Sequence, residues 1–208
     1  MADGANHRRE GLLVDWGGVM TSNLFDSFSA FLTAEGIEAD ALASAFRRDR
    51  SARDALIAFE EGRIHESEFQ TRLAALLGVR SPERLIERLM AGAQLDERMV
   101  QAVRAARTAG VHTGMISNSW GVNNYPRPLL AELFEGVVIS GELGMRKPAP
   151  RMYELGAESI GLAPAGCVFV DDLSFNLEPA RELGMATVLH TSAAQTIAEL
   201  QPLLGVVL

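Results

Sequence analysis

Short apolar runs alternate with longer segments of helical spacing over most of this chain. Each run is bounded by glycine or polar residues, which is typical of strands buried on both faces of a parallel sheet. Between the runs, apolar residues recur at three- and four-residue steps, as one face of a helix requires. This alternation predicts right-handed crossovers and an α/β fold with helices on both faces of the sheet. The predicted strands are Leu12–Val14, Val111–Ile116, Val137–Ile139, Cys167–Val170 and Ala186–Leu189.

The stretch directly after the first predicted strand is different, because it contains helical spacing and no strand pattern. Phe25 and Phe28 begin an apolar helix face, and Ser81 followed by Pro82 is typical of a helix start. The helices predicted here are 41–46, 54–61, 66–77 and 82–90, and those predicted later are 97–109, 128–134, 150–160, 177–183 and 193–200.

These two patterns together predict the domain organisation. Residues 1–20 and 96–208 are expected to form a Rossmann-like catalytic core around a parallel sheet. Residues 21–95 are expected to form an all-helical domain inserted after the first strand. The chain is long enough for one such core domain with a smaller insert.

Composition and charge exclude several classes of partner. The formal net charge of −8 and the isoelectric point of about 5.1 argue against nucleic acid and against an anionic membrane surface. Cys167 is the only cysteine, so no intramolecular disulfide can form, and a buried core role is expected for it. No apolar signal-peptide region follows the polar N-terminal residues. We therefore expect a cytoplasmic protein, whose oligomeric state the sequence leaves open.

Polar side chains follow several predicted strands at the point where each strand ends. Because the carboxyl ends of parallel strands meet at one edge of a sheet, these side chains should converge on one crevice. Carboxylates, a hydroxyl, an amide and an ammonium together suit a phosphate and a hard divalent cation such as Mg²⁺. The residues are Asp15, Ser117, Asn118, Asp171 and Asp172, with Lys147 in a proline-rich loop between the third and fourth strands.

Each element also has an ordinary structural interpretation. The Asp171-Asp172 pair can cap the following helix. Ser117 and Asn118 can form a polar turn, and Lys147 alone is typical of a solvated surface residue. The ordered occurrence of all of them at strand ends favours the functional interpretation.

In this arrangement the chain resembles the haloacid dehalogenase superfamily of phosphohydrolases. The four motifs are Asp15 after an apolar strand, Ser117 in Met-Ile-Ser-Asn, Lys147 in Arg-Lys-Pro, and Asp171-Asp172 in Phe-Val-Asp-Asp. The helical insert is similar to the helical cap of that superfamily. In detail, Ser117 to Gly121 and Asp171 to Leu173 with Asn176 are similar to the phosphatase domain fused to soluble epoxide hydrolases and its stand-alone relatives.

The resemblance implies a role for each motif residue. Asp15 would attack phosphorus and form an aspartyl-phosphate. Mg²⁺ would be held by Asp15, the Gly17 carbonyl and Asp172, with Asp171 direct or through water. Ser117 and Asn118 would bind phosphoryl oxygens, and Lys147 would neutralise the nucleophile and the transition state. The implied substrate is a small phosphorylated metabolite.

One position departs from the superfamily pattern. Phosphatases of this group have a second Asp two residues after the nucleophile, which acts as general acid and base, and here that residue is Gly17. Loss of a general acid is expected to cost roughly 10²- to 10⁴-fold for a poor leaving group. Two alternatives therefore stand beside a phosphatase: a metal-independent hydrolytic dehalogenase, and a phosphate-ligand-binding protein with weak or lost turnover. The Asp171-Asp172 pair argues against the first, and the retained Asp15 and Lys147 argue against the second.

The helical insert offers fewer candidates. Glu60, Glu61 and His65 are expected at a helix-turn-helix junction, where a solvated turn is favoured over a role above the site. Trp120 follows the second motif directly and is expected either to line the substrate pocket or to pack against the cap.

Overall fold

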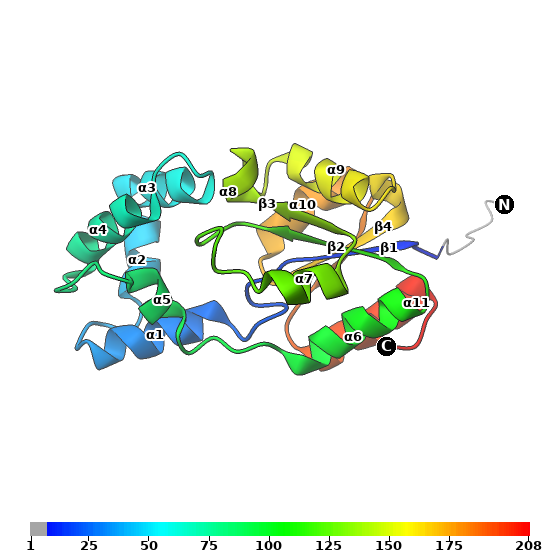
Figure 1. Ribbon diagram of the computed structural model, residues 1–208, viewed down its shortest axis with the longest axis horizontal. Helices are drawn as coiled ribbons and strands as arrows, with labels where there is room; N and C mark the ends of the chain where they lie inside the picture. Colours follow the sequence, from blue (N-terminus) through cyan, green and yellow to red (C-terminus); the bar gives the residue numbers. More distant parts are fainter. Residues whose placement is uncertain (1–7) are drawn as a thin grey trace.

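A five-stranded parallel sheet forms the centre of the larger lobe in the computed structural model, which describes residues 8–208 (Figure 1). The strand order is β3-β2-β1-β4-β5, so the first strand lies in the middle of the sheet. This confirms the predicted α/β class with a Rossmann-like parallel sheet. The strands are β1 (Gly11–Val14), β2 (His112–Ser117), β3 (Gly136–Ile139), β4 (Cys167–Asp171) and β5 (Ala186–Leu189).

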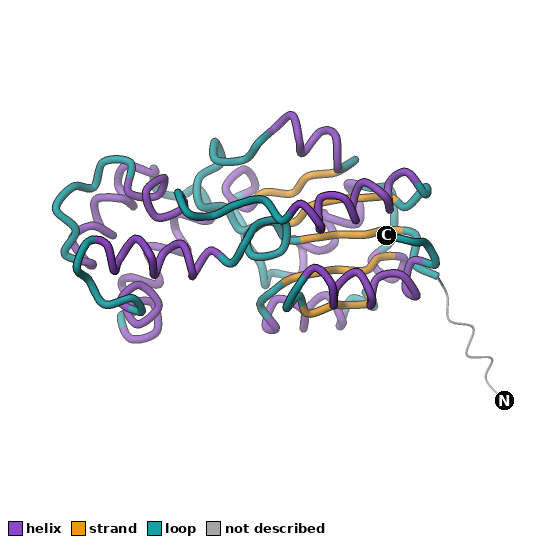
Figure 2. The backbone as a smooth tube through the Cα atoms, turned by 90° about the horizontal axis from the view of Figure 1, so that it is seen from below, coloured by secondary structure: helices purple, strands orange, loops and turns teal. Residues whose placement is uncertain are grey.

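Helices cover both faces of the sheet: they lie above and below it in Figure 1, and Figure 2 shows the strands side by side with helices in front of and behind them. Leu12 and Val14 pack on one face with residues of α6, α7 and α11, whereas Leu13 packs on the other face with residues of α9 and α10. This alternation follows from the two-residue period of side chains along a strand. Cys167 is fully buried in the second of these clusters. The helices are α6 (Glu97–Thr108), α7 (Arg127–Leu133), α8 (Ser140–Leu143), α9 (Pro150–Ser159), α10 (Ser174–Glu182) and α11 (Ala193–Leu204), with a 3₁₀ turn at Pro164–Gly166.

The smaller lobe is the all-helical stretch between β1 and α6. Its helices share a hydrophobic cluster of their own, which includes Phe28, Leu32, Phe59 and Phe69. A separate cluster means that most apolar surface of these helices is buried within the lobe. We call this lobe the cap. Its helices are α1 (Leu24–Ala34), α2 (Ala41–Arg48), α3 (Arg50–Glu60), α4 (Glu66–Leu77) and α5 (Leu85–Met90).

The two segments that join the cap to the sheet lobe pair with each other. Thr21 and Leu95 form an antiparallel bridge, and the Asp96 N–H donates to the Met20 carbonyl at 2.9 Å. This paired connection lies at the boundaries proposed for the domains, after residue 20 and before residue 96. The predicted division, with a core of residues 1–20 and 96–208 and a cap of residues 21–95, stays a prediction that the separate hydrophobic clusters support. Residues 1–7 of the predicted core lie outside the described part of the chain.

Several helix boundaries differ from the sequence prediction. The fifth helix begins at Leu85 rather than Pro82, because Arg84 adopts a left-handed conformation (φ 51°) that interrupts the turn begun at Ser81. The third begins at Arg50 rather than residue 54, because the Asp49 side chain accepts from the N–H groups of Ser51 and Ala52. The tenth begins at Ser174 rather than residue 177. The short helix α8 was not predicted.

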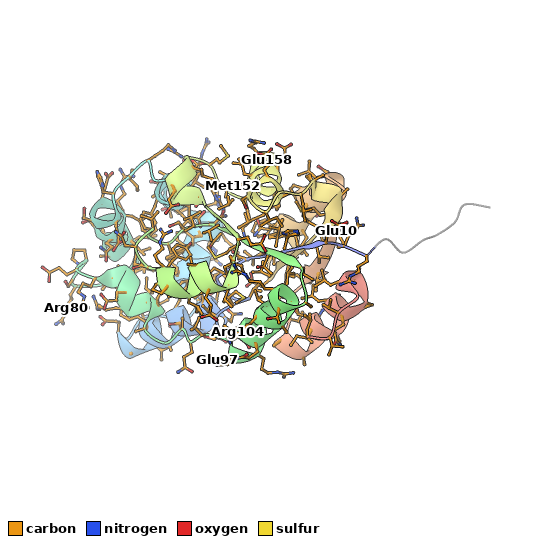
Figure 3. The ribbon with its side chains drawn as sticks, turned by 45° about the vertical axis from the view of Figure 1, so that its right-hand side comes forward. Glu10, Arg80, Glu97, Arg104, Met152 and Glu158 are labelled. Carbon is orange, nitrogen blue, oxygen red and sulfur yellow. The ribbon has the colours of Figure 1, made fainter. Side chains whose placement is uncertain are left out.

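Charged side chains and a few large apolar ones, such as Phe25 and Phe175, are exposed on the surface of the described part of the chain. Charged side chains such as Arg80, Glu97 and Glu158 lie at the periphery, whereas Met152 is buried (Figure 3). Among residues 8–208, no helix has both the length and the apolar character that crossing a membrane requires.

Candidate active site

Three carboxylates meet at the carboxyl edge of the central strands. Parallel pairing of β1 with β4 places Val14 opposite Val170, and the Asp15 N–H donates to the Val170 carbonyl at 2.9 Å. The next residue of each strand therefore brings Asp15 beside Asp171. Oxygen atoms of Asp15, Asp171 and Asp172 all lie within 4.8 Å of one another. The structure thus brings together the three acidic residues that the sequence predicted at one edge.

The Lys147 ammonium lies between two of these carboxylates. Its Nζ is 2.8 Å from Asp15 Oδ1 and 2.7 Å from Asp171 Oδ2, and its side chain is 1% exposed. Burial alone would lower the pKa of this ammonium, but the negative charges of Asp15 and Asp171 outweigh burial and raise its pKa. Burial raises the pKa of Asp15 to about 7, against the lowering effect of Lys147. Lys147 is therefore a permanently charged group at the floor of the site.

Asp171 is held by hydrogen bonds on both of its oxygens. Besides Lys147, it accepts from the Leu173 N–H at 2.9 Å and from the Asn176 amide at 3.0 and 3.1 Å. Asp172 is half-buried, faces the pocket, and has its pKa raised to about 6 by burial and by the charge of Asp171. Asp172 is thus the more available of the two. Asn176, in the first turn of α10 and already part of the resemblance at the fourth motif, orients Asp171.

The two polar residues after β2 differ in what their side chains contact. The Ser117 hydroxyl lies 2.9 Å from the Tyr125 hydroxyl. The Asn118 amide donates to the Lys147 carbonyl at 3.1 Å and accepts from the Lys147 N–H at 2.8 Å. Asn118 therefore fixes the backbone of the lysine loop, and its side-chain hydrogen bonds are used there. Tyr125 was missed in the sequence because a lone tyrosine in a loop carries no pattern.

The residues present fit a hard divalent cation. All three clustered side chains offer carboxylate oxygens, which are the donors that Mg²⁺ prefers. A Cβ added at Gly18 (φ 77°) would lie 2.3 Å from Asp172 Oδ2, so the glycine loop presses its backbone against this carboxylate. The loop approaches the acidic cluster closely only because it has no side chain there.

The two glycines of this loop are expected to respond differently to substitution. Gly18→Ala should lower the free energy of unfolding by about 1–2 kcal/mol, because alanine is strained at positive φ, and its methyl group would also collide with Asp172. Gly17→Ala should cost less, since Gly17 is not at positive φ and its added methyl group meets only the Leu24 side chain end. Urea denaturation of both variants measures the difference. Equal losses would contradict the described loop conformation.

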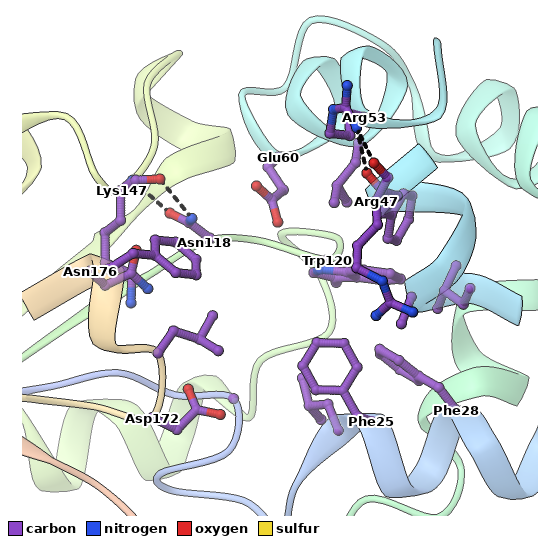
Figure 4. A pocket seen from close by; sticks show the side chains of 18 of the residues that line it. Phe25, Phe28, Arg47, Arg53, Glu60, Asn118, Trp120, Lys147, Asp172 and Asn176 are labelled. Carbon is purple, nitrogen blue, oxygen red and sulfur yellow. Dashed lines mark hydrogen bonds between the residues drawn. The ribbon is translucent and has the colours of Figure 1, made fainter. Parts of the chain in front are cut away.

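A pocket of about 780 Å³ lies above these residues, between the sheet lobe and the cap (Figure 4). Asp15, Asn118, Lys147 and Asp172 line its polar end. Its other walls are mostly apolar and come from α1, α2 and α3 of the cap, with Trp120 and the start of α10. The larger apolar residues are Leu24, Phe25, Phe28, Leu42, Phe46, Leu56, Ile57, Trp120, Leu173 and Phe175.

Trp120 both lines the pocket and packs against the cap. Its ring stacks on Phe28 at 5.0 Å between centroids and contacts Phe46 and Phe69 edge-on. A residue of the sheet lobe therefore belongs to the hydrophobic cluster of the cap. This contact fixes how the cap sits over the carboxylates.

Glu60 corrects the prediction of a solvated turn. The last residue of α3 is 4% exposed and lines the pocket, whereas Glu61 is half-buried and His65 is exposed. Glu60 Oε2 lies 2.6 Å from Nε of Arg146, the residue that precedes Lys147 in the sequence. Burial raises the pKa of Glu60 to about 7, although Arg146 and Lys147 lower it. Local sequence gave no signal, because this burial depends on contacts with a distant loop.

Comparison with known proteins identifies the family to which this site belongs. The family model of haloacid dehalogenase-like hydrolases matches residues 10–184. The chain belongs to the haloacid dehalogenase-like hydrolases. This confirms the resemblance inferred from the four motifs.

Two curated relatives and one solved structure illustrate what this hydrolase is similar to. Bifunctional epoxide hydrolase 2 of Rattus norvegicus is 30% identical over 128 residues, which cover 58% of this chain but only 23% of that protein. The chain thus spans about a quarter of the length of that relative. Sesquiterpene phosphatase of Aspergillus oryzae is 29% identical over 152 residues, covering 71% of this hydrolase and 78% of the phosphatase. A haloacid dehalogenase family enzyme of Bacteroides thetaiotaomicron, solved with magnesium and inorganic phosphate, shares the fold (TM-score 0.62, 21% identity, 86% of this chain and 93% of that chain).

Proposed function

We propose that this hydrolase is a Mg²⁺-dependent phosphomonoesterase that works through an aspartyl-phosphate. The observation that carries the proposal is the acidic cluster with Lys147 at the polar end of a pocket. A carboxylate nucleophile beside a buried ammonium can approach an anionic phosphate, because the ammonium offsets part of the repulsion. The phosphatase relative and the phosphate-bound structure support the choice of a phosphoryl group.

Each residue near the nucleophile then has a defined task. Asp15 attacks phosphorus, and its carboxylate suits this task because the resulting mixed anhydride is hydrolysed readily. Lys147 favours the charged form of Asp15 and neutralises charge on the transferring group. The Ser117 hydroxyl donates to a phosphoryl oxygen while the Tyr125 hydroxyl donates to Ser117 Oγ. Asn118 keeps the lysine loop in place and offers its backbone N–H to the phosphate.

Mg²⁺ would be held by Asp15, Asp172 and the Gly17 carbonyl, with Asp171 direct or through water. The ion would supply charge stabilisation for the phosphoryl group during transfer. The oxygens of Asp171 already accept hydrogen bonds from Lys147, Leu173 and Asn176. This favours Asp172 over Asp171 as the carboxylate that coordinates the ion directly.

The pocket walls favour an apolar group on the phosphate ester. Ten large apolar side chains line the space beyond the polar end, and five of them belong to α1 and α2. An alkyl chain buried there gains about 0.8 kcal/mol for each methylene, which is roughly a fourfold gain in affinity. Sugar-like esters, whose hydroxyls would lose water against these apolar walls, should bind less well.

A screen of phosphate release with and without Mg²⁺ tests the proposal. We expect kcat/KM to rise about threefold to fourfold per methylene along a series of n-alkyl phosphates until the pocket is full. Glucose 6-phosphate is the polar comparison. The same protein is incubated with 2-chloropropionate to detect halide release. Halide release without metal would favour a dehalogenase, and phosphate binding without release would favour a binding protein.

A further inference from the structure

The pocket lacks a proton donor at the position where related phosphatases keep theirs. Gly17 has no side chain, and the nearest group to a Cβ built there is the Leu24 methyl at 2.7 Å. An apolar side chain of the cap therefore fills the space that a carboxyl would need. A simple alkyl ester nevertheless requires a proton on its departing oxygen, because an alkoxide is a poor leaving group.

The other ionisable groups of the pocket leave one candidate. Lys147 and Arg146 stay charged, since the first pairs with two carboxylates and guanidinium groups do not release protons in proteins. Of the carboxyl groups that line the pocket within residues 8–208, Asp15 and Asp172 belong to the acidic cluster, and Asp40 is exposed and pairs with Arg47. Glu60 is the remaining one, and it is buried.

We propose that Glu60, supplied by the cap, donates the proton to the departing oxygen and recovers it from the attacking water, in place of the acid missing at Gly17. This assignment rests on the proposed phosphatase function. In the first step the bond from Asp15 to phosphorus forms, the bond from phosphorus to the ester oxygen breaks, and the Glu60 proton moves to that oxygen. In the second step water attacks phosphorus, its proton moves to Glu60, and the bond to Asp15 breaks to release phosphate.

The position of Glu60 suits this task. Figure 4 shows its carboxyl group within the pocket, between Lys147 with Asn118 on one side and Trp120 on the other. The Ser140 hydroxyl donates to the Glu60 carbonyl, and Ser140 Oγ also accepts from the Ser119 N–H at 2.8 Å. These bonds tie the end of α3 to the loop after β2. The carboxyl group is therefore held at a fixed place relative to the phosphate site.

The surroundings of Glu60 allow both of its charge states. Its Oε2 is 2.6 Å from Arg146 Nε without hydrogen-bond alignment, so no donor within residues 8–208 satisfies this buried oxygen. Burial and the charge of Glu61 raise its pKa, and Arg146, Lys147 and Trp120 lower it, with a balance of about 7. Such a group is partly protonated at neutral pH, as acid-base exchange requires. Arg146 stabilises the carboxylate after the proton has left.

Glu60→Gln tests the assignment with two ester types. The variant keeps the shape and polarity of the side chain but cannot exchange a proton. We expect kcat/KM for an alkyl phosphate to fall about 10²-fold, whereas p-nitrophenyl phosphate should lose less than about threefold, because its leaving group is already a stable anion. Glu68→Gln, on the exposed surface of the cap helix α4 and outside the pocket lining, is the matched control and should change neither value.

The pH profile separates proton transfer from a structural role. In the native protein, kcat/KM for the alkyl ester should fall above about pH 7 as Glu60 loses its proton, and this limb should disappear in Glu60→Gln. Arg146→Gln removes a charge that lowers the pKa of Glu60, so the limb should move to higher pH. Equal losses of kcat/KM on both esters in Glu60→Gln, or an unchanged fall at high pH in the two variants, would overturn the role of Glu60 and leave the proposed function in place. A native protein inactive on both esters would overturn the proposed function together with it.

Discussion

Asp15→Asn is expected to reduce phosphate release by roughly 10⁴- to 10⁶-fold, the range found when a catalytic nucleophile is removed. Asparagine keeps the shape of the side chain and its contact with the Lys147 ammonium but cannot form the mixed anhydride. The fold should persist, because the substitution removes one of three clustered negative charges and leaves Asp171 paired with Lys147. The measurement is kcat/KM for the best ester of the screen.

A second measurement distinguishes loss of the nucleophile from loss of the site. Beryllium fluoride with Mg²⁺ mimics an aspartyl-phosphate, so it should raise the melting temperature of the native protein and leave Asp15→Asn unchanged. The exposed Asp26 on α1 provides the matched control, because Asp26→Asn makes the same chemical change outside the acidic cluster and the pocket lining. Wild-type turnover in Asp15→Asn would rule out the covalent mechanism.

Lys147→Met is expected to cost both activity and stability. Activity should fall about 10²- to 10³-fold, the usual effect of removing one group that stabilises developing charge. The free energy of unfolding at pH 8 should fall by about 3–5 kcal/mol, because Asp15 and Asp171 would remain buried without their cation. Denaturation in urea without metal measures the stability change.

The pH dependence of that loss has a definite sign. Without Lys147, the pKa of Asp15 must rise further above its unfolded value, since burial already raises it and the lowering charge is gone. Between the pKa of Asp15 in the unfolded chain and its higher pKa in the folded variant, the folded variant binds more protons than the unfolded chain. The stability of the variant therefore rises as the pH falls. The gap between variant and native protein should therefore narrow from pH 8 to pH 5. A constant gap would indicate lost packing rather than unpaired charge.

Lys147 also allows a direct measurement in the native protein. It is the only lysine in the sequence, and the other basic side chains are arginine or histidine. Protein labelled with isotopes in lysine should therefore show one side-chain signal by nuclear magnetic resonance. That signal should keep the chemical shift of a charged ammonium beyond the ordinary pKa of lysine, because the two carboxylates raise it. A lysine that titrates at or below its ordinary value would contradict the described pairing.

The sequence by itself determined the sheet and the residues at its carboxyl edge. Buried strands need continuous apolar runs, and parallel strands all end at one edge, so Asp15, Ser117 and Asp171 were bound to converge once the strands were recognised. The helical character of the cap followed equally from the spacing of its apolar residues. These features are visible along the chain because each depends on neighbouring residues and on a topology with few solutions.

Only the tertiary structure decided what each polar group contacts. Asn118 gives its amide to the lysine loop rather than to solvent, and Trp120 of the sheet lobe packs inside the cap. Glu60 lies at the end of a helix with no distinguishing local pattern, and it is buried because Ser140 and Arg146 meet it from the sheet lobe, 80 and more residues further along the chain. Burial sets the pKa and the partners of a carboxyl group, and burial arises from contacts between distant segments that no local pattern encodes.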